Sequence, residues 1–357
     1  MINGQITITL ERAILQRDKG SLLVDVRTPD EFADGTIPGA VNVPIFDNEE
    51  RAQVGTLYTQ EGSRQARRLG VELVAPKIPD LIARVEEALG ECSGPVLVFC
   101  WRGGMRSKAI TDFLNLAGIP ARQIVGGHKA FRRLVLEFFE QKAWGRLLVL
   151  RGLTGTGKTR LLHELEEAGR PVLDLEGLAC HRGSAFGAVG LEQQLTQKNF
   201  EAQLWDALRM IPADGYAVSE GESRHIGRLV LPRQVYEALQ EEISLWVETP
   251  LEQRIDIILE DYPARESQAK LFRRPIQTLT ERLGKQKVEQ LLDYLEQGEW
   301  RQLVRELMVD YYDPLYRHTR PEQRIEIRMD PWKEGLEQLQ REIDRLLNEP
   351  EVKPADA

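Results

Sequence analysis

Eight residues near the middle of the chain constrain its fold more than any other feature. The segment Gly152-Leu153-Thr154-Gly155-Thr156-Gly157-Lys158-Thr159 satisfies the pattern G-x-x-x-x-G-K-[S/T] in full. The apolar run Leu147–Leu150 directly precedes the motif and a helical pattern over Thr159–Ala168 follows it, which is the strand–loop–helix setting that a phosphate-binding loop requires. The sequence therefore predicts a phosphate site where a strand of an α/β sheet ends.

The residue types in this loop suit the binding of a diphosphate. Glycines let backbone N–H groups turn toward phosphate oxygens, and the N-terminus of the following helix adds a partial positive charge. Lys158 would bring its charge to the terminal phosphates, and Thr159 could bring its hydroxyl to Mg²⁺. The motif leaves open whether the ligand is ATP, GTP or another diphosphate. The predicted diphosphate-binding residues are Gly152, Thr154, Gly155, Thr156, Gly157, Lys158 and Thr159.

Short apolar runs alternate with helical patterns on both sides of the loop, which predicts parallel sheets. The 357 residues are enough for two domains, and Trp144-Gly145 interrupts a helical pattern, so we place a boundary near Lys142–Arg146. The expected fold class is α/β, with a parallel-sheet domain over residues 1–140 and a phosphate-loop domain over residues 141–357 that has a helical C-terminal region. Besides Leu147–Leu150, strands are expected at Leu22–Val26, Ala40–Val43, Val96–Phe99, Gln123–Val125, Val172–Leu175, Tyr216–Ser219 and Ile243–Val247, and helices at Ile78–Leu89, Ser107–Ala117, Lys129–Ala143 and Trp332–Leu347.

Two of the expected strands are followed by carboxylates. Asp174 and Glu176 follow Val172-Leu173, while Glu220 and Glu222 follow Tyr216–Ser219. Each of the four could coordinate Mg²⁺ or contact a substrate. Each could equally cap a helix or form an ion pair, and the sequence does not separate these roles.

A cysteine-containing loop forms a second candidate site. The strand Val96–Phe99 runs into Cys100, and a helical pattern begins seven residues later. Backbone N–H groups at such a strand-to-helix turn, together with Arg102 and Arg106, favour a thiolate and would stabilise an anionic atom attached to the sulfur. Cys92 and Cys180 lack this setting. The loop residues of the candidate site are Trp101, Arg102, Gly103, Gly104, Met105 and Arg106.

Charge limits the ways in which this chain could bind nucleic acid. With 47 Lys+Arg against 56 Asp+Glu, the net charge of -9 argues against binding through the average field of the protein. The segment Pro263–Val288 is locally basic, and it is either a solvated helix face or a surface for phosphate backbone. The candidate nucleic-acid-contact residues are Arg265, Lys270, Arg273 and Arg274, with Arg64, Arg67 and Arg68 as helpers.

The expected location follows from what the sequence lacks. Three cysteines are too few, and odd in number, for a disulfide-stapled secreted fold. The first residues show no signal-peptide pattern, and no apolar run approaches the ~18 residues of a membrane span. We therefore expect a cytoplasmic protein with no membrane partner.

The first domain carries motifs of a known family. Asp25–Phe32 (DVRTPDEF) and Gly35–Pro44 (GTIPGAVNVP) resemble the rhodanese signature, with Cys100 in the persulfide-forming position. Five residues separate Cys100 from Arg106, one more than in the commonest sulfurtransferase loops. That longer loop also occurs in rhodanese-like dual-specificity phosphatases, but these usually carry His before the cysteine, where this chain has Phe99.

Four motifs in one order point to a narrower family. Cys100–Ser107, Gly126–Arg132, the phosphate loop and Asp174–Ser184 together resemble the tRNA 2-selenouridine synthases. The resemblance implies a transferase that acts on tRNA with a 2-thiouridine wobble base. It would alkylate the sulfur with geranyl diphosphate and then exchange the geranylated sulfur for selenium from selenophosphate, through a selenylsulfide on Cys100. It implies no tightly bound cofactor and no resident metal, with Mg²⁺ as a possible helper.

Other classes of function remain open from the residues. The chain could be a rhodanese-fused P-loop ATPase or kinase, or a sulfurtransferase in which Cys100 carries sulfur to a small molecule or a protein. It could also be a regulatory binding module, although the intact phosphate loop argues against that. ATP turnover without tRNA would favour the ATPase, whereas tight tRNA binding with little ATPase would favour the transferase.

Overall fold

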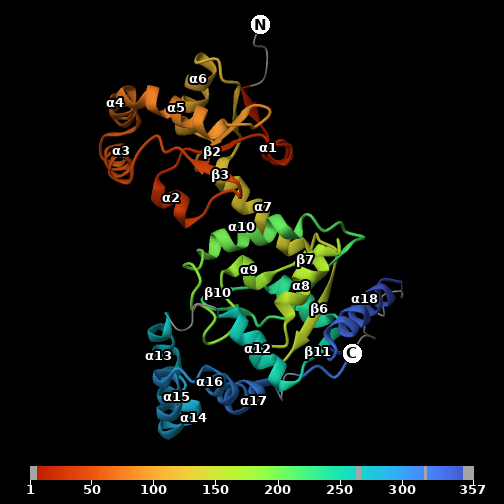
Figure 1. Ribbon diagram of the computed structural model, residues 1–357. Helices are drawn as coiled ribbons and strands as arrows, with labels where there is room; N and C mark the ends of the chain where they lie inside the picture. The colour runs from red at the N-terminus through yellow and green to blue at the C-terminus, as the bar shows by residue number, and fades with distance from the viewer. Residues whose placement is uncertain (1–5, 263–266, 317–319, 349–357) are drawn as a thin grey trace. The chain divides into compact units, whose positions relative to one another are not determined.

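We describe residues 6–262, 267–316 and 320–348 of a computed structural model, which separates into two compact units (Figure 1). The first unit holds Met1–Gln141 and Thr196–Asp206, and the second holds Lys142–Leu195 and Ala207–Ala357. The units differ from the sequence-based domains in one respect beyond a shift of a residue at the boundary. A segment from far along the chain, Thr196–Asp206, belongs to the first unit.

The first unit is built on a five-stranded, wholly parallel sheet. Its strands are β1 Thr7–Ile8, β2 Leu23–Asp25, β3 Ala40–Asn42, β4 Val96–Phe99 and β5 Ala121–Ile124, in the spatial order β1-β5-β4-β2-β3. β2 and β4 occupy the middle in the register Val24↔Val98, and both of these valines are fully buried. Such apolar central strands are typical of a parallel sheet covered by helices on both faces.

Helices connect the strands of the first unit. They are α1 Leu10–Arg17, α2 Pro29–Asp34, α3 Asn48–Glu61, α4 Ser63–Val74, α5 Ile78–Leu89, α6 Met105–Leu116 and α7 Gly127–Gln141, with a short 3-10 turn at Ala75–Lys77. Thr28 and Glu31 form a reciprocal capping box at the start of α2, with Pro29 as its first residue. The strands and helices expected here are present, with ends that differ by no more than two residues. The short edge strand β1 was not expected.

The added segment of the first unit lies in α10, Gln197–Leu208, and is held by several polar contacts. The Thr196 hydroxyl donates to the Asp34 carbonyl at 2.7 Å, and Asn199 Oδ1 accepts from the Thr36 N–H at 3.0 Å. Arg132 pairs with Glu201 at 2.6 Å. These partners lie in α2, in the loop that follows α2, and in α7. The added segment therefore holds the loop between α2 and β3 in place.

The second unit has its own five-stranded parallel sheet. The strands are β6 Arg146–Gly152, β7 Val172–Leu173, β8 Tyr216–Glu220, β11 Ser244–Glu248 and β12 Arg324–Arg328, in the order β12-β11-β6-β8-β7. β6 lies in the centre, where Leu148 and Leu150 are fully buried. The phosphate loop therefore leaves the middle strand of the sheet. A two-stranded antiparallel hairpin, β9 His225–Ile226 and β10 Leu229–Val230, lies outside this sheet.

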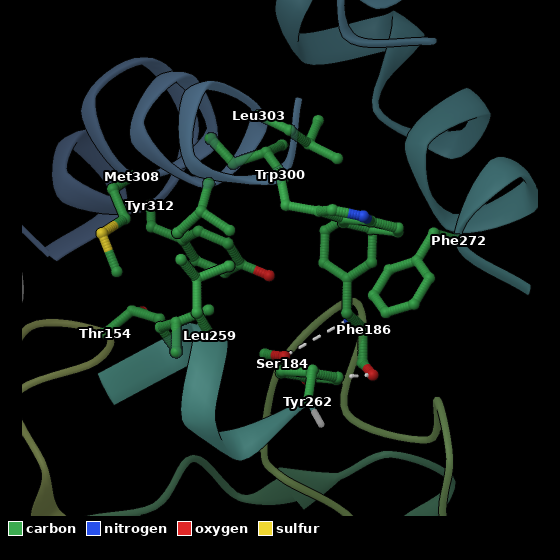
Figure 2. A pocket seen from close by; sticks show the side chains of 13 residues that line it. Thr154, Ser184, Phe186, Leu259, Tyr262, Phe272, Trp300, Leu303, Met308 and Tyr312 are labelled. Atoms are coloured by element: carbon green, nitrogen blue, oxygen red, sulfur yellow. Dashed lines mark hydrogen bonds between the residues drawn. The ribbon is translucent and has the colours of Figure 1, made fainter. Parts of the chain in front are cut away.

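Helices surround this sheet and extend into a separate helical part. Those of the α/β portion are α8 Lys158–Glu167, α9 Leu175–Ala179, α11 Arg233–Glu241, α12 Leu251–Asp261 and α18 Trp332–Asn348. The helical part comprises α13 Ala269–Thr278, α14 Thr280–Leu283, α15 Lys285–Gln297, α16 Trp300–Leu307, a π-helical turn Met308–Tyr312 and α17 Asp313–Tyr316. It has a hydrophobic core of its own, which includes Phe272 and Trp300 (Figure 2).

The strands of the second unit correct the sequence analysis at two places. Val172–Leu175 was expected to be extended, but β7 ends at Leu173 because Asp174 caps α9. β12 was missed because its sequence, RIEIR, alternates charged and apolar residues as an edge strand does. The expected helix Trp332–Leu347 is present as α18, and its Leu339 and Ile343 are fully buried in the core.

Candidate functional site

Cys100 lies at the carboxyl end of the central strand β4 and is 3% exposed. Its Sγ accepts a hydrogen bond from the Gly104 N–H at 3.3 Å and lies 3.2 Å from the Ser107 hydroxyl. The start of α6 therefore supplies one donor, the Gly104 N–H, and one hydroxyl that can donate to the sulfur. A thiolate, or an anionic atom attached to it, is stabilised by donors oriented in this way.

Two residues outside the predicted site hold this loop in shape. The Gln123 side-chain amide donates to the Gly103 and Gly104 carbonyls at 2.8 and 2.9 Å and to the Ser107 hydroxyl at 2.9 Å. Because the Ser107 oxygen accepts from Gln123, its own proton is free to point toward Cys100 or the Gly104 carbonyl. The sequence signal for Gln123 is a polar residue inside a short apolar strand.

A pair of glycines closes the back of the cysteine loop. Gly127 has a φ of +55°, and a Cβ there would lie 2.1 Å from the Cys100 carbonyl oxygen. At Gly103, with a φ of +63°, a Cβ would lie 2.7 Å from the Ile124 carbonyl oxygen. Only glycine fits either position, because the two backbones touch and both φ angles are positive. The segment Gly126–Arg132 thus serves to shape the loop around Cys100.

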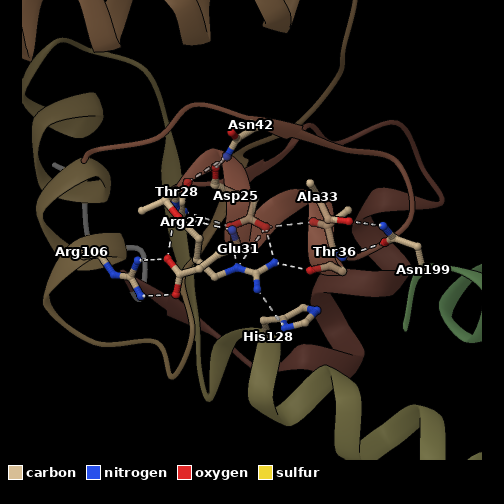
Figure 3. Close-up of polar contacts among 11 residues, drawn as sticks. Asp25, Arg27, Thr28, Glu31, Ala33, Thr36, Asn42, Arg106, His128 and Asn199 are labelled. Atoms are coloured by element: carbon tan, nitrogen blue, oxygen red, sulfur yellow. Dashed lines mark hydrogen bonds and ion pairs between the residues drawn. The ribbon is translucent and has the colours of Figure 1, made fainter. Parts of the chain in front are cut away.

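A buried ion pair lies at the carboxyl end of β2 (Figure 3). Arg27 and Asp25 are 2% and 0% exposed and pair at 2.6 Å, and the Thr36 hydroxyl donates to the same carboxylate at 2.9 Å. Arg27 also donates to the Gly35 carbonyl at 2.6 Å and lies 3.1 Å from His128 Nδ1. Asp25 and Arg27 of the rhodanese-like motif therefore connect the end of β2 to the segment Gly35-Thr36, and they are not part of the cysteine loop.

Arg106 was expected to support the thiolate, but the structure gives it another partner. It pairs with both carboxylate oxygens of Glu31, at 2.5 and 3.2 Å. Burial alone would raise the pKa of Glu31, and Arg106 outweighs that effect and lowers it. The Arg106 charge is therefore balanced by a carboxylate, while Trp101, Arg102 and Met105 are exposed on the outside of the loop.

The buried His128 predicts how the stability of the first unit depends on pH. Burial, followed by the charge of Arg27, lowers the pKa of His128 to about 3. Between pH ~6.5 and 3 the unfolded chain therefore binds a proton that the folded unit excludes, so stability is lost as the pH falls through this window. His128→Gln should reduce this dependence by up to about 1.4 kcal/mol per pH unit. Urea titrations at pH 7, 6 and 5, read by hydrogen exchange in β2 and β4, will measure it. Equal slopes in the two proteins would contradict it.

The phosphate loop of the second unit has the shape its motif predicts. Gly155 and Gly157 have φ angles of +76° and +84°, and α8 begins at Lys158. Lys158 Nζ lies 3.4 Å from the carbonyl oxygens of Gly152 and Leu153, so the side chain folds back over the loop. This leaves the ammonium at the mouth of the loop, where a phosphate could replace the two weak contacts.

A buried arginine fixes the outer wall of the phosphate loop. Arg254 in α12 is 3% exposed and donates from Nε to the Thr154 carbonyl at 2.9 Å. Its two terminal nitrogens pair with Asp313 at 3.0 and 2.6 Å. Removing Asp313 would leave the buried charge of Arg254 without its counter-ion, which is strongly destabilising. Neither residue was expected from the sequence.

The structure separates the roles of the four predicted acids. Asp174 caps α9 by accepting from the Gly177 N–H at 2.7 Å. Glu176 lies 3.4 Å from the Thr159 hydroxyl, and its backbone N–H donates to Glu220 at 2.7 Å. The carboxyl groups of Glu176 and Glu222 are themselves hydrogen-bonded. The predicted acids thus meet beside the phosphate loop, with Asp174 acting mainly as a helix cap.

The surroundings of these carboxyl groups raise their pKa values. Burial, and then the charge of Glu222, raise the pKa of Glu176 to about 8. Burial also raises the pKa values of Glu220 and Glu222, although Lys158 opposes the shift at Glu222. One cavity of about 390 Å³ connects the loop with this group, and its walls include Lys158, Thr159, Glu176 and Glu222. Cys180, to which the sequence analysis assigns no role, also lines this cavity.

The basic segment is partly neutralised by acidic neighbours. Arg265 lies outside the described residues. Lys270, Arg273 and Arg274 are exposed on α13, whose opposite face buries Phe272 and Ile276. Arg273 pairs with Glu296, and Lys287 pairs with Asp310 at 2.6 Å. Of the predicted contact residues that the structure describes in this segment, Lys270 and Arg274 form no ion pair, so they are the strongest of those candidates for contact with an external phosphate.

Comparison with protein families distinguishes among the functions that the two sites allow. Residues 145–344 match the model described as the tRNA 2-selenouridine synthase AAA domain, and residues 9–134 match the rhodanese-like domain. The chain belongs to the tRNA 2-selenouridine synthase family. Cys100 lies within the rhodanese-like match, and the phosphate loop and its acidic neighbours lie within the AAA match.

Individual members of the tRNA 2-selenouridine synthase family are similar over much of the chain. The synthase of Nitrosomonas europaea is 40% identical over 246 residues, which cover 67% of this chain and 63% of that protein. The synthase of Cupriavidus pinatubonensis is 37% identical over 330 residues, and the aligned region covers 83% of this chain and 88% of that protein. The synthase of Hydrogenovibrio crunogenus is 35% identical over 343 residues, and the aligned region covers 86% of this chain and 90% of that protein. Across the part of the chain that the structure describes, no helix has the length and apolar character needed to cross a bilayer.

Proposed function

We propose that this protein replaces sulfur by selenium at C2 of the wobble 2-thiouridine of tRNA, in the cytoplasm. The observation that supports the proposal is the presence, in one chain and in the family's order, of an amide-held cysteine and a complete phosphate loop. Each part matches one chemical need of the exchange. A thiocarbonyl sulfur is a poor leaving group, so it must be activated before selenium can displace it.

The phosphate-loop unit would carry out the activation. The thiocarbonyl sulfur attacks C1 of geranyl diphosphate, the C–O bond breaks, diphosphate leaves with the electron pair, and the uridine N3 proton is released. The loop N–H groups and Lys158 would stabilise the charge that develops on the leaving diphosphate. The product is an S-geranyl-2-thiouridine, from which sulfur can depart as geranylthiol.

The cysteine unit would then deliver selenium. The net reaction consumes S-geranyl-2-thiouridine, selenophosphate and water, and yields 2-selenouridine, geranylthiol and phosphate. Selenium held as a selenylsulfide on Cys100 is two electrons more oxidised than in selenophosphate. A disulfide must therefore accept two electrons on loading, and two thiols return them on discharge. The Gly104 N–H and the Ser107 hydroxyl would stabilise the terminal selenium anion.

Mg²⁺ would fit beside the phosphate loop as a helper of the activation step. The Thr159 hydroxyl and the Glu176 carboxylate lie 3.4 Å apart, and oxygen ligands are those that Mg²⁺ prefers. No cluster of three or more metal-ligating side chains occurs among the residues described here. A magnesium ion held by these two groups and by the substrate phosphates would neutralise charge on the diphosphate.

A nucleoside assay tests the proposed function. The purified protein is given tRNA containing 2-thiouridine, first with geranyl diphosphate and then with selenophosphate, a disulfide that accepts the two electrons of loading, and the corresponding thiol. Digestion and mass spectrometry should detect S-geranyl-2-thiouridine after the first addition and 2-selenouridine after the second. ATP hydrolysis without tRNA, with neither nucleoside formed, would favour a rhodanese-fused ATPase instead.

The exposed cations of α13 are the proposed contact for tRNA phosphates. The double variant Lys270→Ala, Arg274→Ala should weaken tRNA binding and reduce the log–log salt slope by roughly 0.7 to 0.9 for each phosphate that the protein no longer neutralises. Filter binding at several salt concentrations measures the slope. Lys287→Ala is the matched control, because Lys287 is already paired with Asp310 and should leave the slope unchanged. An unchanged slope in the double variant would make this segment a solvated helix face.

A further inference from the structure

An almost wholly apolar chamber lies beside the phosphate loop (Figure 2). Its walls come from α12, α13, α16, the π-helical turn Met308–Tyr312 and the segment that holds Ser184 and Phe186. Carbon atoms cover nearly all of its surface, and Figure 2 shows Thr154 and Phe272 on opposite sides of the space. The residues that bear on its role are Phe186, Phe272, Trp300, Leu303, Met308 and Tyr312.

The chamber adjoins the site for phosphate. Thr154 of the loop, Ser184 and Tyr262 line both the chamber and the 390 Å³ cavity that contains Lys158. At the apex of the loop, a Cβ on Gly155 would lie 2.8 Å from Met308 Cε and 2.9 Å from Ile258 Cγ1, and both of these residues line the chamber. A single ligand could therefore place phosphate on the loop and its remainder in the chamber.

Two polar groups in the chamber wall already have hydrogen-bond partners in the protein. The Ser184 hydroxyl accepts from the Phe186 N–H at 3.3 Å, and the Tyr262 hydroxyl donates to the Phe186 carbonyl at 3.3 Å. A nucleotide base in this space would lose its hydrogen bonds to water and gain few in return. The wall therefore favours a hydrocarbon chain over adenine or guanine.

Aromatic rings close the end of the chamber away from Thr154. The Phe272 ring lies 5.3 Å from Trp300, 5.6 Å from Tyr262 and 6.1 Å from Phe186, measured between ring centroids. Phe272 and Trp300 are 7% and 8% exposed, so they are fixed by packing on their outer side. The free space is about 60 Å³. At roughly 10–15 Å³ for each water-sized group, this admits about four to six carbon-sized groups, or one five-carbon unit.

We propose that this chamber binds the terminal part of a prenyl chain whose diphosphate lies on the phosphate loop, and that Phe272 and Trp300 limit its length. The inference rests on the proposed function. It adds a binding site for the prenyl chain and two residues that limit the length of that chain. The five carbons next to the diphosphate would cross the larger cavity, and the next five would fill the chamber. A ten-carbon chain therefore fits, whereas a fifteen-carbon chain would have to displace the aromatic rings.

Binding of unmodified full-length protein to a series of diphosphates gives the first test. Calorimetry with inorganic diphosphate, geranyl diphosphate and farnesyl diphosphate compares chains of zero, ten and fifteen carbons. Geranyl diphosphate should bind at least about 10²-fold more tightly than inorganic diphosphate, since apolar carbons are buried. Farnesyl diphosphate should bind about tenfold more weakly than the geranyl compound, because overpacking is unfavourable. Equal affinity for the two chains would overturn the inference.

Two variants change the size of the chamber in opposite directions. Leu303→Phe fills the chamber and should lower the affinity for geranyl diphosphate by about tenfold, without changing the affinity for inorganic diphosphate. Trp300→Leu lengthens it and should shift the preference toward farnesyl diphosphate by about tenfold. Leu271→Phe is the matched control, because Leu271 is 54% exposed on the same helix as Phe272. Retained binding of inorganic diphosphate reports an intact phosphate loop in each variant.

The outcomes separate this inference from the proposed function. If geranyl diphosphate binds no better than inorganic diphosphate and no S-geranyl nucleoside forms, the proposed function fails. If the S-geranyl nucleoside forms but Leu303→Phe and Trp300→Leu leave both affinities unchanged, only the chamber inference fails. If a variant also loses binding of inorganic diphosphate, its phosphate loop is damaged. The chamber inference is then judged by the affinities of the unmodified protein for geranyl and farnesyl diphosphate.

Discussion

Replacing Cys100 with serine is expected to abolish 2-selenouridine formation, by at least about 10³-fold, the scale on which loss of a nucleophile acts. The hydroxyl would keep the contacts with the Gly104 N–H and Ser107, so the fold of the loop should persist. Serine cannot carry selenium at physiological pH as a thiolate can. The expected product is tRNA that stops at S-geranyl-2-thiouridine, because the proposed function assigns the activation step to the phosphate loop and not to Cys100. Mass spectrometry of digested tRNA measures both nucleosides.

The control for this prediction is Cys92→Ala, because Cys92 is exposed and lies outside both sites. Cys180 is unsuitable as a control, since it lines the cavity of the phosphate loop. Selenation by Cys100→Ser at the rate of the unmodified protein would exclude the selenylsulfide. Parallel loss of the S-geranyl intermediate would indicate damage to the fold rather than loss of the nucleophile.

Lys158→Ala should reduce S-geranyl-2-thiouridine formation by roughly 10²-fold, the effect of removing one oriented charge from a developing anion. The hydrogen bonds of Lys158 to other described residues are two weak ones of 3.4 Å, so its removal should leave the loop folded. The rate of S-geranyl nucleoside formation at saturating tRNA measures the effect. Supplied with tRNA that is already geranylated, the variant should still form 2-selenouridine, which tests whether the loop serves only the first step.

A glycine variant of the loop would be harder to interpret. A Cβ at Gly157 would lie 2.6 Å from the Trp332 ring, and the φ of +84° disfavours any other residue. Gly157→Ala would therefore disturb the packing of α18 as well as the approach of phosphate. Equal loss of both reaction steps in Lys158→Ala would contradict a diphosphate-binding role and would favour a structural role for the lysine.

Local sequence was sufficient for most elements and for the frames of both sites. The strands β4 and β6 are apolar runs, and each leads into a loop whose glycines require positive φ angles, so pattern and backbone chemistry lead to the same structure. The acids Glu176, Glu220 and Glu222 were also predictable as neighbours of the loop, because they follow strands of one parallel sheet. The edge strands β1 and β12 were not, because a short or half-exposed strand has no continuous apolar run.

The sequence by itself determined the α/β class, the cysteine at a strand end and the phosphate-loop motif, because each strand, helix or loop pattern lies within a short stretch of the chain. Only the tertiary structure decided which side chains complete these sites. Gln123 reaches the cysteine loop from the adjacent strand, Arg254 fixes Thr154 from a distance of 100 residues, and Glu31 takes the charge of Arg106. The apolar chamber likewise combines five separated segments. Such contacts depend on side-chain packing between distant elements, and no local periodicity encodes that packing.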